Sequence, residues 1–232
     1  MKKAFMNWSG GKDSSLALYH ILKDKKLSIN YLLTNLSAEH NRISMHGVRF
    51  ELLKLQANSL NIPLETMSIQ KDASMENYGK QVTKKMAFFT DKGIDNCVFG
   101  DIFLEDLKTY RENQLKPVGI TAHFPLWKRP TIDIIKEFID IGFKAKVVSI
   151  NAKLLDKSFA GRELDRSFIN DLPKNVDVCG ENGEFHSFVY DGPIFKKPIP
   201  IKVGDVVKRE YKSDENSEWD NAFWYADLEL SK

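Results

Sequence analysis

The sequence contains few cysteines and no long apolar run. Its two cysteines, Cys97 and Cys179, lie far apart and form no CxxC pair, so neither a disulfide framework nor a cysteine-based zinc site is expected. No segment approaches the roughly 18–20 apolar residues that a membrane-spanning helix needs. The basic N-terminus lacks the apolar region of a secretory signal. We therefore expect a protein of the reducing cytoplasm, without a membrane partner.

Excess charge of one sign is also absent. The 34 Lys and Arg residues nearly balance the 32 Asp and Glu residues, and the formal net charge is +2. Such a small excess does not predict a surface that attracts nucleic acid, so a nucleic-acid partner is not expected. The chain also lacks low-complexity tracts and internal repeats. Its 232 residues suit one domain of ordinary size, or a larger domain with a small one attached.

Short apolar segments alternate with amphipathic ones over the first two-thirds of the chain. The pattern predicts strands at residues 3–8, 29–36, 64–69, 95–101 and 144–150, and helices at residues 14–26, 48–60, 75–93 and 131–142. Repeated β-then-α units are typical of an α/β fold, in which helices flank both faces of a parallel sheet. We therefore assign residues 1–150 to an α/β ligand-binding domain.

The pattern changes after about residue 150. One more helix is predicted within residues 161–172, and hairpin-like strands are predicted at residues 184–195, 198–211 and 221–230. Residues 151–232 should therefore form a smaller, mixed α+β part on the substrate side. Ligands of open α/β sheets bind beyond the carboxyl ends of the strands, so the turns after the first and fourth strands should face one crevice.

The turn after the first strand reads "SGGKDSS" and contains the parts of a phosphate-binding loop. Gly10 and Gly11 allow a tight turn and let backbone N–H groups approach an anion. Ser14 or Ser15 is expected to cap the following helix, whose N-terminus adds partial positive charge. A strand-turn-helix corner also favours Gly and Ser for conformational reasons alone.

The charged pair inside this turn distinguishes a functional loop from a merely conformational one. Lys12 supplies a full positive charge for a phosphate group, and Asp13 could hold Mg²⁺ or cap the helix. The spacing is neither that of GxxxxGK[ST] nor that of GxGxxG. The sequence instead resembles the PP-loop of the ATP pyrophosphatase superfamily, whose pattern is SGG-x-DS.

The resemblance implies a Rossmann-like, adenine-nucleotide alpha-hydrolase-like fold that cleaves ATP between its α- and β-phosphates. AMP and pyrophosphate are then the products, and the substrate passes through an adenylated form. The residues that would bind the phosphates are Ser9, Gly10, Gly11, Lys12, Asp13, Ser14 and Ser15.

Three more stretches narrow the resemblance. They are "LTNLSAEHNRISMHGV" at residues 33–48, "FGDIFLEDLKTYREN" at residues 99–113 and "DVCGENGEFHSFVYDGPIF" at residues 177–195. Together with the loop, they look like the diphthine–ammonia ligase (diphthamide synthase) family, and the match spans most of residues 1–198.

The family resemblance implies roles at the matching positions. His46 and Gly47 would help to shape the nucleotide site, together with Gly100. Asp101, Glu105 and Arg111 would lie at the mouth of the crevice. The acceptor side would be formed by Glu105 and by the "GENGE" segment, which comprises Gly180, Glu181, Asn182, Gly183 and Glu184.

Physical chemistry supports part of this assignment. Lys12 and Arg111 could stabilise the leaving pyrophosphate, while Asp13 and Asp101 are candidate Mg²⁺ ligands at strand-end turns. Two nearby carboxylates in a turn could orient or deprotonate ammonia. The predicted catalytic residues are Lys12, Asp13, Asp101, Arg111, Glu181 and Glu184.

The late motif departs from the family pattern. Members that make diphthamide usually have two glycines between the glutamates, and Asn182 occupies one of those places here. The continuation of the motif resembles the bacterial branch of the family. The acceptor therefore stays open among diphthine-like, cobalamin-related and other carboxylates. Because the sequence has no glutaminase-like section, free ammonia is the expected nitrogen donor.

The leading hypothesis is an ATP-dependent, Mg²⁺-requiring ligase that joins ammonia to a carboxylate-bearing acceptor, with a homodimer as a candidate assembly. One alternative is an RNA-modifying enzyme of the tRNA thiolation or lysidine type. Thiolases of this superfamily use paired cysteines, which Cys97 and Cys179 would have to provide. The other alternative is a non-catalytic adenine-nucleotide sensor, for which Lys12, Asp13 and the "GENGE" segment would be unnecessary.

Overall fold

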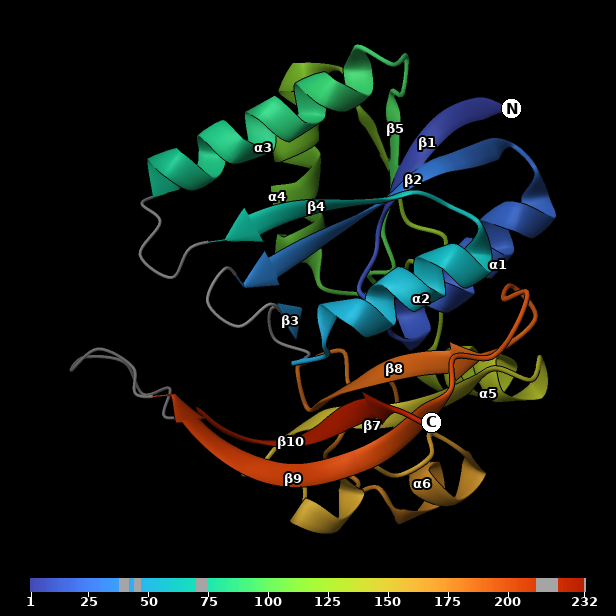
Figure 1. The fold of residues 1–232 in the computed structure, drawn as a ribbon, viewed down its shortest axis with the longest axis vertical. Helices are drawn as coiled ribbons and strands as arrows, with labels where there is room; N and C mark the ends of the chain where they lie inside the picture. Colours follow the sequence, from blue (N-terminus) through green and yellow to red (C-terminus); the bar gives the residue numbers. More distant parts are fainter. Residues whose placement is uncertain (38–41, 44–46, 70–74, 212–220, 232) are drawn as a thin grey trace.

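The computed structural model describes residues 1–37, 42–43, 47–69, 75–211 and 221–231. These residues form two sheets, one above the other in Figure 1. The first sheet contains β1 (Lys2–Asn7), β2 (Leu27–Ser37), β3 (Arg42–Ile43), β4 (Leu64–Ile69), β5 (Asn96–Val98) and β6 (Thr121–His123). The helical segments of this half are α1 (Lys12–Asp24), α2 (Phe50–Leu60), α3 (Met75–Thr90), α4 (Glu105–Leu115) and the 3₁₀ turn η1 (Lys116–Val118).

The first sheet is mostly parallel. Strand β1 pairs in parallel with β2 on one side and with β5 on the other, and β6 follows β5. The long strand β2 pairs with β1 along its first part and with β4 along its second, while the two-residue β3 is antiparallel to its end. The predicted α/β fold class is confirmed.

Alternating side chains of β1 supply both faces of this sheet, as the two-residue period of a strand requires. Ala4 and Met6 pack into the core beside α1 and α2, whereas Phe5 packs on the opposite face. There the Phe5 ring stacks on Phe89 of α3, with 4.0 Å between centroids. Helices α3 and α4 lie on that side, while α1 and α2 lie between the two sheets (Figure 1).

The second sheet has the order β8-β7-β10-β9, and its neighbouring strands are antiparallel. Its strands are β7 (Lys144–Asn151), β8 (Phe185–Asp191), β9 (Ile201–Tyr211) and β10 (Asn221–Leu230). The accompanying helical segments are α5 (Thr131–Asp140), η2 (Lys157–Phe159) and α6 (Arg166–Asp171).

One prediction about this half is wrong in detail, and another is confirmed. The strand at residues 144–150 was assigned to the parallel sheet, but β7 pairs with β8 and β10 instead. A buried apolar strand after a helix looks the same in either sheet, so the pattern could not decide. The helix predicted within residues 161–172 is present as Arg166–Asp171, and it begins there because Asp165 is its N-cap and accepts a hydrogen bond from the Phe168 N–H at 2.8 Å.

The two halves share one core and several polar links. Apolar side chains of α1, α2 and α5 pack together with those of β7 and β8. Asp227 of β10 accepts hydrogen bonds from Arg42 at 2.8 Å and from Arg49 at 2.6 Å, so it ties the start of α2 to the second sheet. This arrangement places the edge strand β8 directly against the first turn of α1.

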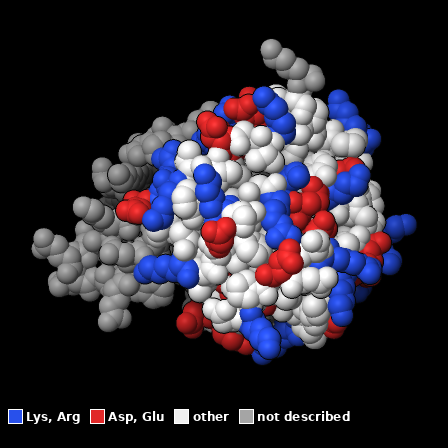
Figure 2. Space-filling view, turned by 90° about the horizontal axis from the view of Figure 1, so that it is seen from below, with Lys and Arg blue, Asp and Glu red and all other residues white. Residues whose placement is uncertain are grey.

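The surface of the described residues carries both signs of charge. On the face seen in Figure 2, Lys and Arg side chains are interspersed with Asp and Glu side chains. Within the same described residues, no helix is both long and apolar enough to cross a bilayer.

Candidate functional site

The turn between β1 and α1 takes its shape from two glycines. Gly10 has a φ of +76°, in the left-handed region that favours glycine. Gly11 is the N-cap of α1, and a Cβ atom there would lie 3.0 Å from the Ser187 carbonyl oxygen of β8. The loop therefore needs glycine twice, once for its backbone angle and once for its close approach to the second sheet.

The serines of the loop do not cap the helix as predicted. The helix already begins at Lys12, and no side chain caps it. Ser14 lies inside the first turn, where its hydroxyl donates to the Gly11 carbonyl at 3.0 Å, and Ser15 is also within the helix. Ser9 accepts a hydrogen bond from the Gly11 N–H at 3.2 Å. The first helical bond runs from the Ser15 N–H to Gly11, so the N–H groups before it have no helical acceptor.

A cavity of about 210 Å³ opens in front of this loop. The turn after β5 and the "GENGE" segment contribute to its wall, so the expected meeting of the strand-end turns in one crevice is confirmed. Its volume is below the ~300–1,000 Å³ of a typical small-molecule pocket, so it suits one end of a larger ligand. The lining residues are Asn7, Ser9, Gly11, Lys12, Asp13, Ser14, Gly100, Asp101, Arg111, Gly180, Glu181, Phe185, His186 and Ser187.

Lys12 and Asp13 form an ion pair at the cavity wall. The Lys12 Nζ lies 2.8 Å from Asp13 Oδ2, and the lysine side chain is only 5% exposed. Burial opposes the charged form of Lys12, but the charges of Asp13 and other neighbours outweigh it and raise the lysine pKa. Burial also raises the pKa of Asp13, against the effect of Lys12. Lys12 thus keeps its positive charge although it is buried.

Asp101 and Arg111 form the second pair. The Arg111 Nε lies 2.8 Å from Asp101 Oδ2, and the guanidinium also stacks over the Phe99 ring, 4.4 Å from its centroid. Gly100 precedes this pair, and a Cβ atom there would come within 2.9 Å of the Asp13 backbone. A glycine at this position therefore allows the β5 turn to pack against the first turn of α1.

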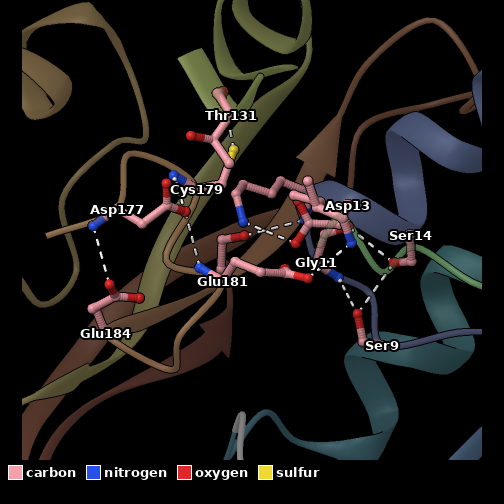
Figure 3. A network of polar contacts seen from close by, with 12 residues as sticks. Ser9, Gly11, Asp13, Ser14, Thr131, Asp177, Cys179, Glu181 and Glu184 are labelled. Atoms are coloured by element: carbon pink, nitrogen blue, oxygen red, sulfur yellow. Dashed lines mark hydrogen bonds and ion pairs between the residues drawn. The ribbon is translucent and has the colours of Figure 1, made fainter. Parts of the chain in front are cut away.

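Glu181 enters the same cavity from the second half of the chain. Its Oε1 accepts a hydrogen bond from the Ile102 N–H at 2.8 Å. Burial, followed by the negative charge of Asp13, raises the pKa of Glu181 to about 7. Figure 3 shows its side chain extending towards Asp13. A carboxyl group with this pKa exchanges its proton near neutral pH.

Glu184, which is predicted to act beside Glu181, is not among the described residues that line the cavity. Its carboxylate is buried and accepts hydrogen bonds from the Asp177 N–H at 3.0 Å, from the Asn182 N–H at 2.9 Å and from the Asn182 side chain at 3.0 Å. The two carboxylates have different partners, and Gly183 (φ +84°) lies in the turn between them. Glu184 therefore holds the loop that presents Glu181 (Figure 3).

Six other predicted residues that the structure describes are not among those that line the cavity, namely Gly10, Ser15, Gly47, Glu105, Asn182 and Gly183. Glu105 is in the exposed first turn of α4, with its carboxylate 2.9 Å from Lys128. Gly47 (φ +69°) packs against Tyr225 of β10, where a Cβ atom would lie 2.8 Å from the ring. His46 lies outside the described residues.

The sequence patterns assign no site role to several residues of the wall. Phe185, His186 and Ser187 come from β8, and Asn7 is the last residue of β1. The Ser187 hydroxyl accepts a hydrogen bond from the Lys12 N–H at 3.2 Å. The sequence shows the alternation of apolar and polar residues in β8, but only the fold brings that strand to the turn between β1 and α1.

The acidic residues of the cavity fit a cation that is held together with a nucleotide. Asp13 Oδ1 is buried without a hydrogen-bond partner, and Asp101 lies in the same wall. Among the described residues, no three His, Cys, Asp or Glu side chains are placed to hold a metal ion by themselves. Mg²⁺ commonly takes one or two carboxylates and completes its shell with phosphate oxygens and water, so this donor set is adequate.

The two cysteines belong to different parts of the core. Cys97 packs on the α3 side of the first sheet, whereas Cys179 packs in the core shared by the two halves. Burial raises the pKa of both thiols. Since the thiolate is the reactive form, neither cysteine is activated as a nucleophile.

Comparison with known proteins finds family models that match both halves of the chain. The family model of the diphthamide synthase N-terminal domain matches residues 1–122, and that of the C-terminal domain matches residues 130–231. A human protein named diphthine--ammonia ligase is 34% identical over 110 residues, which cover 45% of this chain and 41% of the human protein.

Two further relatives carry the same name. The rat protein is 25% identical over 224 residues, covering 86% of this chain and 82% of the rat protein. The Schizosaccharomyces pombe protein is 25% identical over 222 residues, covering 86% of this chain but 36% of the yeast protein. The chain thus matches less than half the length of the human and yeast relatives. Because the N-terminal family model alone covers more than half of the sequence, this chain belongs to the diphthamide synthase family.

Proposed function

We propose that the protein is an ATP-dependent ligase that adenylates a substrate carboxylate and then amidates it with ammonia. The observation that carries the proposal is the convergence of Lys12, Arg111 and Glu181 on one cavity beside the glycine loop. The relatives are named diphthine--ammonia ligase, so a diphthine-type carboxylate is the first acceptor to test.

The proposed reaction has two steps. An acceptor carboxylate oxygen attacks the α-phosphorus of ATP, the bond to the β-phosphate breaks, and pyrophosphate leaves. Ammonia then attacks the acyl carbon, AMP leaves, and a base takes the proton that the nitrogen loses. The mixed anhydride makes this second step feasible, because a free carboxylate offers no comparable leaving group.

The residues of the cavity divide between these steps. Lys12 and Arg111 place positive charge where the pyrophosphate develops. Glu181 has a pKa of about 7 and accepts the proton from the attacking nitrogen. Phe185, beneath the Lys12 ammonium at 5.5 Å, helps to exclude water from this side.

The charges of the cavity also imply a divalent cation. Lys12 is paired with Asp13 and Arg111 is paired with Asp101, so these four groups sum to no net charge. A bare triphosphate would meet no excess of positive charge. We propose that Mg²⁺ accompanies the nucleotide on Asp13, and bound Mg²⁺ would neutralise charge on the departing pyrophosphate.

Isotope transfer tests this chemistry. The protein is incubated with ATP, Mg²⁺, ammonium and a diphthine-type acceptor whose carboxylate carries ¹⁸O. Adenylation predicts that one ¹⁸O atom moves to AMP, that pyrophosphate appears in equal amount, and that the product is the amide of the acceptor, in which the other carboxylate oxygen is retained. Release of ADP and orthophosphate would contradict the proposal, and binding of ATP without turnover would favour a sensor.

The same incubation with a metabolite extract extends the test to other carboxylates. Amide products are recognised by incorporation of ¹⁵N from labelled ammonium. The raised pKa of both cysteine thiols favours this ligase over a thiolation enzyme that depends on cysteine thiolates.

A further inference from the structure

A buried glutamine outside the sequence motifs contacts the glycine loop. Gln56 lies on α2 and is 0% exposed. Its Oε1 accepts a hydrogen bond from the Trp8 indole N–H at 3.0 Å, just after β1. Its Nε2 donates to the Gly10 carbonyl at 3.0 Å and to the Val189 carbonyl of β8. One side chain thus joins the loop, the end of β1 and the second sheet.

Gln56 occupies a position that an apolar residue would normally fill. Its neighbours on α2, Leu52, Leu53 and Ala57, are buried and apolar. A buried amide is costly unless its donors and acceptor are satisfied, and here the three bonds satisfy it. A core filled with leucine would meet the needs of packing, so stability alone does not account for an amide at this position.

The Gly10 carbonyl is the point on which these contacts meet. It accepts one hydrogen bond from Gln56 and a second from the Val189 N–H at 2.9 Å, which occupies both of its lone pairs. A Cβ atom on Gly10 would lie 2.6 Å from Gln56 Oε1. The orientation of the peptide between Gly10 and Gly11 is therefore fixed by contacts from α2 and β8.

We propose that Gln56 is a positioning residue for nucleotide binding, because it clamps the phosphate loop against the edge of the second sheet. This inference rests on the proposed function, in which the loop binds the triphosphate. A peptide held in this orientation keeps the backbone of the loop in one shape at the cavity wall before the ligand arrives. Both halves of the chain thus build the nucleotide site.

Ser59 provides a matched control on the same helix. It is 1% exposed, and its hydroxyl donates to the Lys197 carbonyl at 2.6 Å and accepts from the Lys197 N–H at 3.1 Å. Like Gln56, it links α2 to the second half of the chain. Its bonds run to the segment after β8 and not to the loop, so its loss should affect stability without moving the loop.

The test compares wild type, Gln56→Met and Ser59→Ala by calorimetric titration with Mg·ATP and by thermal unfolding. Methionine keeps the length of the side chain and removes its donors. Loss of a residue that holds a binding group in place typically weakens ligand affinity about 10- to 100-fold. We therefore expect the Kd of Gln56→Met for Mg·ATP to rise by that factor. Ser59→Ala should bind within about twofold of wild type.

The outcomes separate this inference from the proposed function. Unchanged binding by Gln56→Met, or equal weakening in Gln56→Met and Ser59→Ala, would overturn the positioning role. If wild type binds no Mg·ATP, the proposed function is itself wrong and the inference falls with it.

Amide hydrogen exchange of the wild type gives a second test that needs no variant. At Mg·ATP concentrations of 100 times Kd, exchange of the Val189 N–H and the Trp8 indole N–H should slow by up to about 100-fold, because opening the clamp would release the ligand. The Lys197 N–H, which bonds to Ser59, should slow much less. Equal slowing at both places would contradict a local clamp.

Discussion

Replacing Glu181 with glutamine should stabilise the protein at pH 8 more than at pH 5. Burial is the main cause that raises the pKa of Glu181 from 4.5 to about 7. The folded state therefore holds this proton more tightly than the unfolded state, and the resulting stability is lost as the pH rises through about 7. At about 1.4 kcal/mol per pKa unit, wild type should lose about 2–3 kcal/mol between pH 5 and pH 8 through this group.

Glutamine keeps the size of the side chain and an oxygen for the Ile102 N–H, but it cannot ionise. The assay is urea unfolding of wild type and variant at pH 5, 6, 7 and 8, without nucleotide or Mg²⁺. The difference in unfolding free energy should grow with pH. Glu105→Gln is the control, because Glu105 is exposed, its pKa is lowered through Lys128, and it stays ionised over this range. A difference for Glu181→Gln that is constant with pH would refute the reasoning.

Three further predictions concern the loop, the "GENGE" turn and the link between the halves. Lys12→Ala should abolish pyrophosphate release from ATP while circular dichroism stays that of wild type; undiminished release would mean that the loop is wrongly assigned. Glu184→Gln should lower the Tm, because the Glu184 carboxylate accepts hydrogen bonds from three N–H donors and each donor left unpaired costs about 1–3 kcal/mol. The same variant should slow adenylation and amide formation together. A selective loss of amide formation would instead place Glu184 on the acceptor side. Burial raises the pKa of Asp227, but hydrogen bonds from Arg49 and Arg42 outweigh burial and lower that pKa from 3.8 to about 2. The stability that the Asp227 carboxylate contributes is therefore present above pH 4 and is lost as the pH falls towards 2. Asp227→Asn should lose that contribution at pH 7, and a Tm profile equal to that of wild type would refute it.

The local hydrophobic pattern of the sequence is sufficient to predict most helices and strands in the first half of the chain. The strand predicted at residues 64–69 coincides with β4, because a short apolar run bounded by Pro63 and polar residues has clear limits. The start of α1 was placed two residues late, since Ser14 looks like a cap in sequence. In the structure Gly11 takes that position, and its close approach to β8 explains why the position carries no side chain.

The candidate site was predictable where it coincides with contiguous motifs, and not where it depends on contacts between halves. The loop and the β5 turn meet as the parallel topology requires. Glu181 and Glu184 are equivalent in the sequence pattern, and only the structure shows that Glu181 lines the cavity while Glu184 is buried among hydrogen-bond donors of its own loop. Ser187 lies within the stretch at residues 177–195 and Gln56 lies outside the quoted stretches, but both are common residue types in ordinary strand and helix patterns, so the sequence assigns neither a role.

The most direct test of the account is a crystal structure of the protein with Mg²⁺ and a non-hydrolysable ATP analogue. The account predicts that the triphosphate lies over the turn that contains Gly10 and Gly11, within reach of Lys12 and Arg111, and that Mg²⁺ contacts Asp13. A triphosphate bound elsewhere on the protein, with this turn unoccupied, would contradict the proposed chemistry.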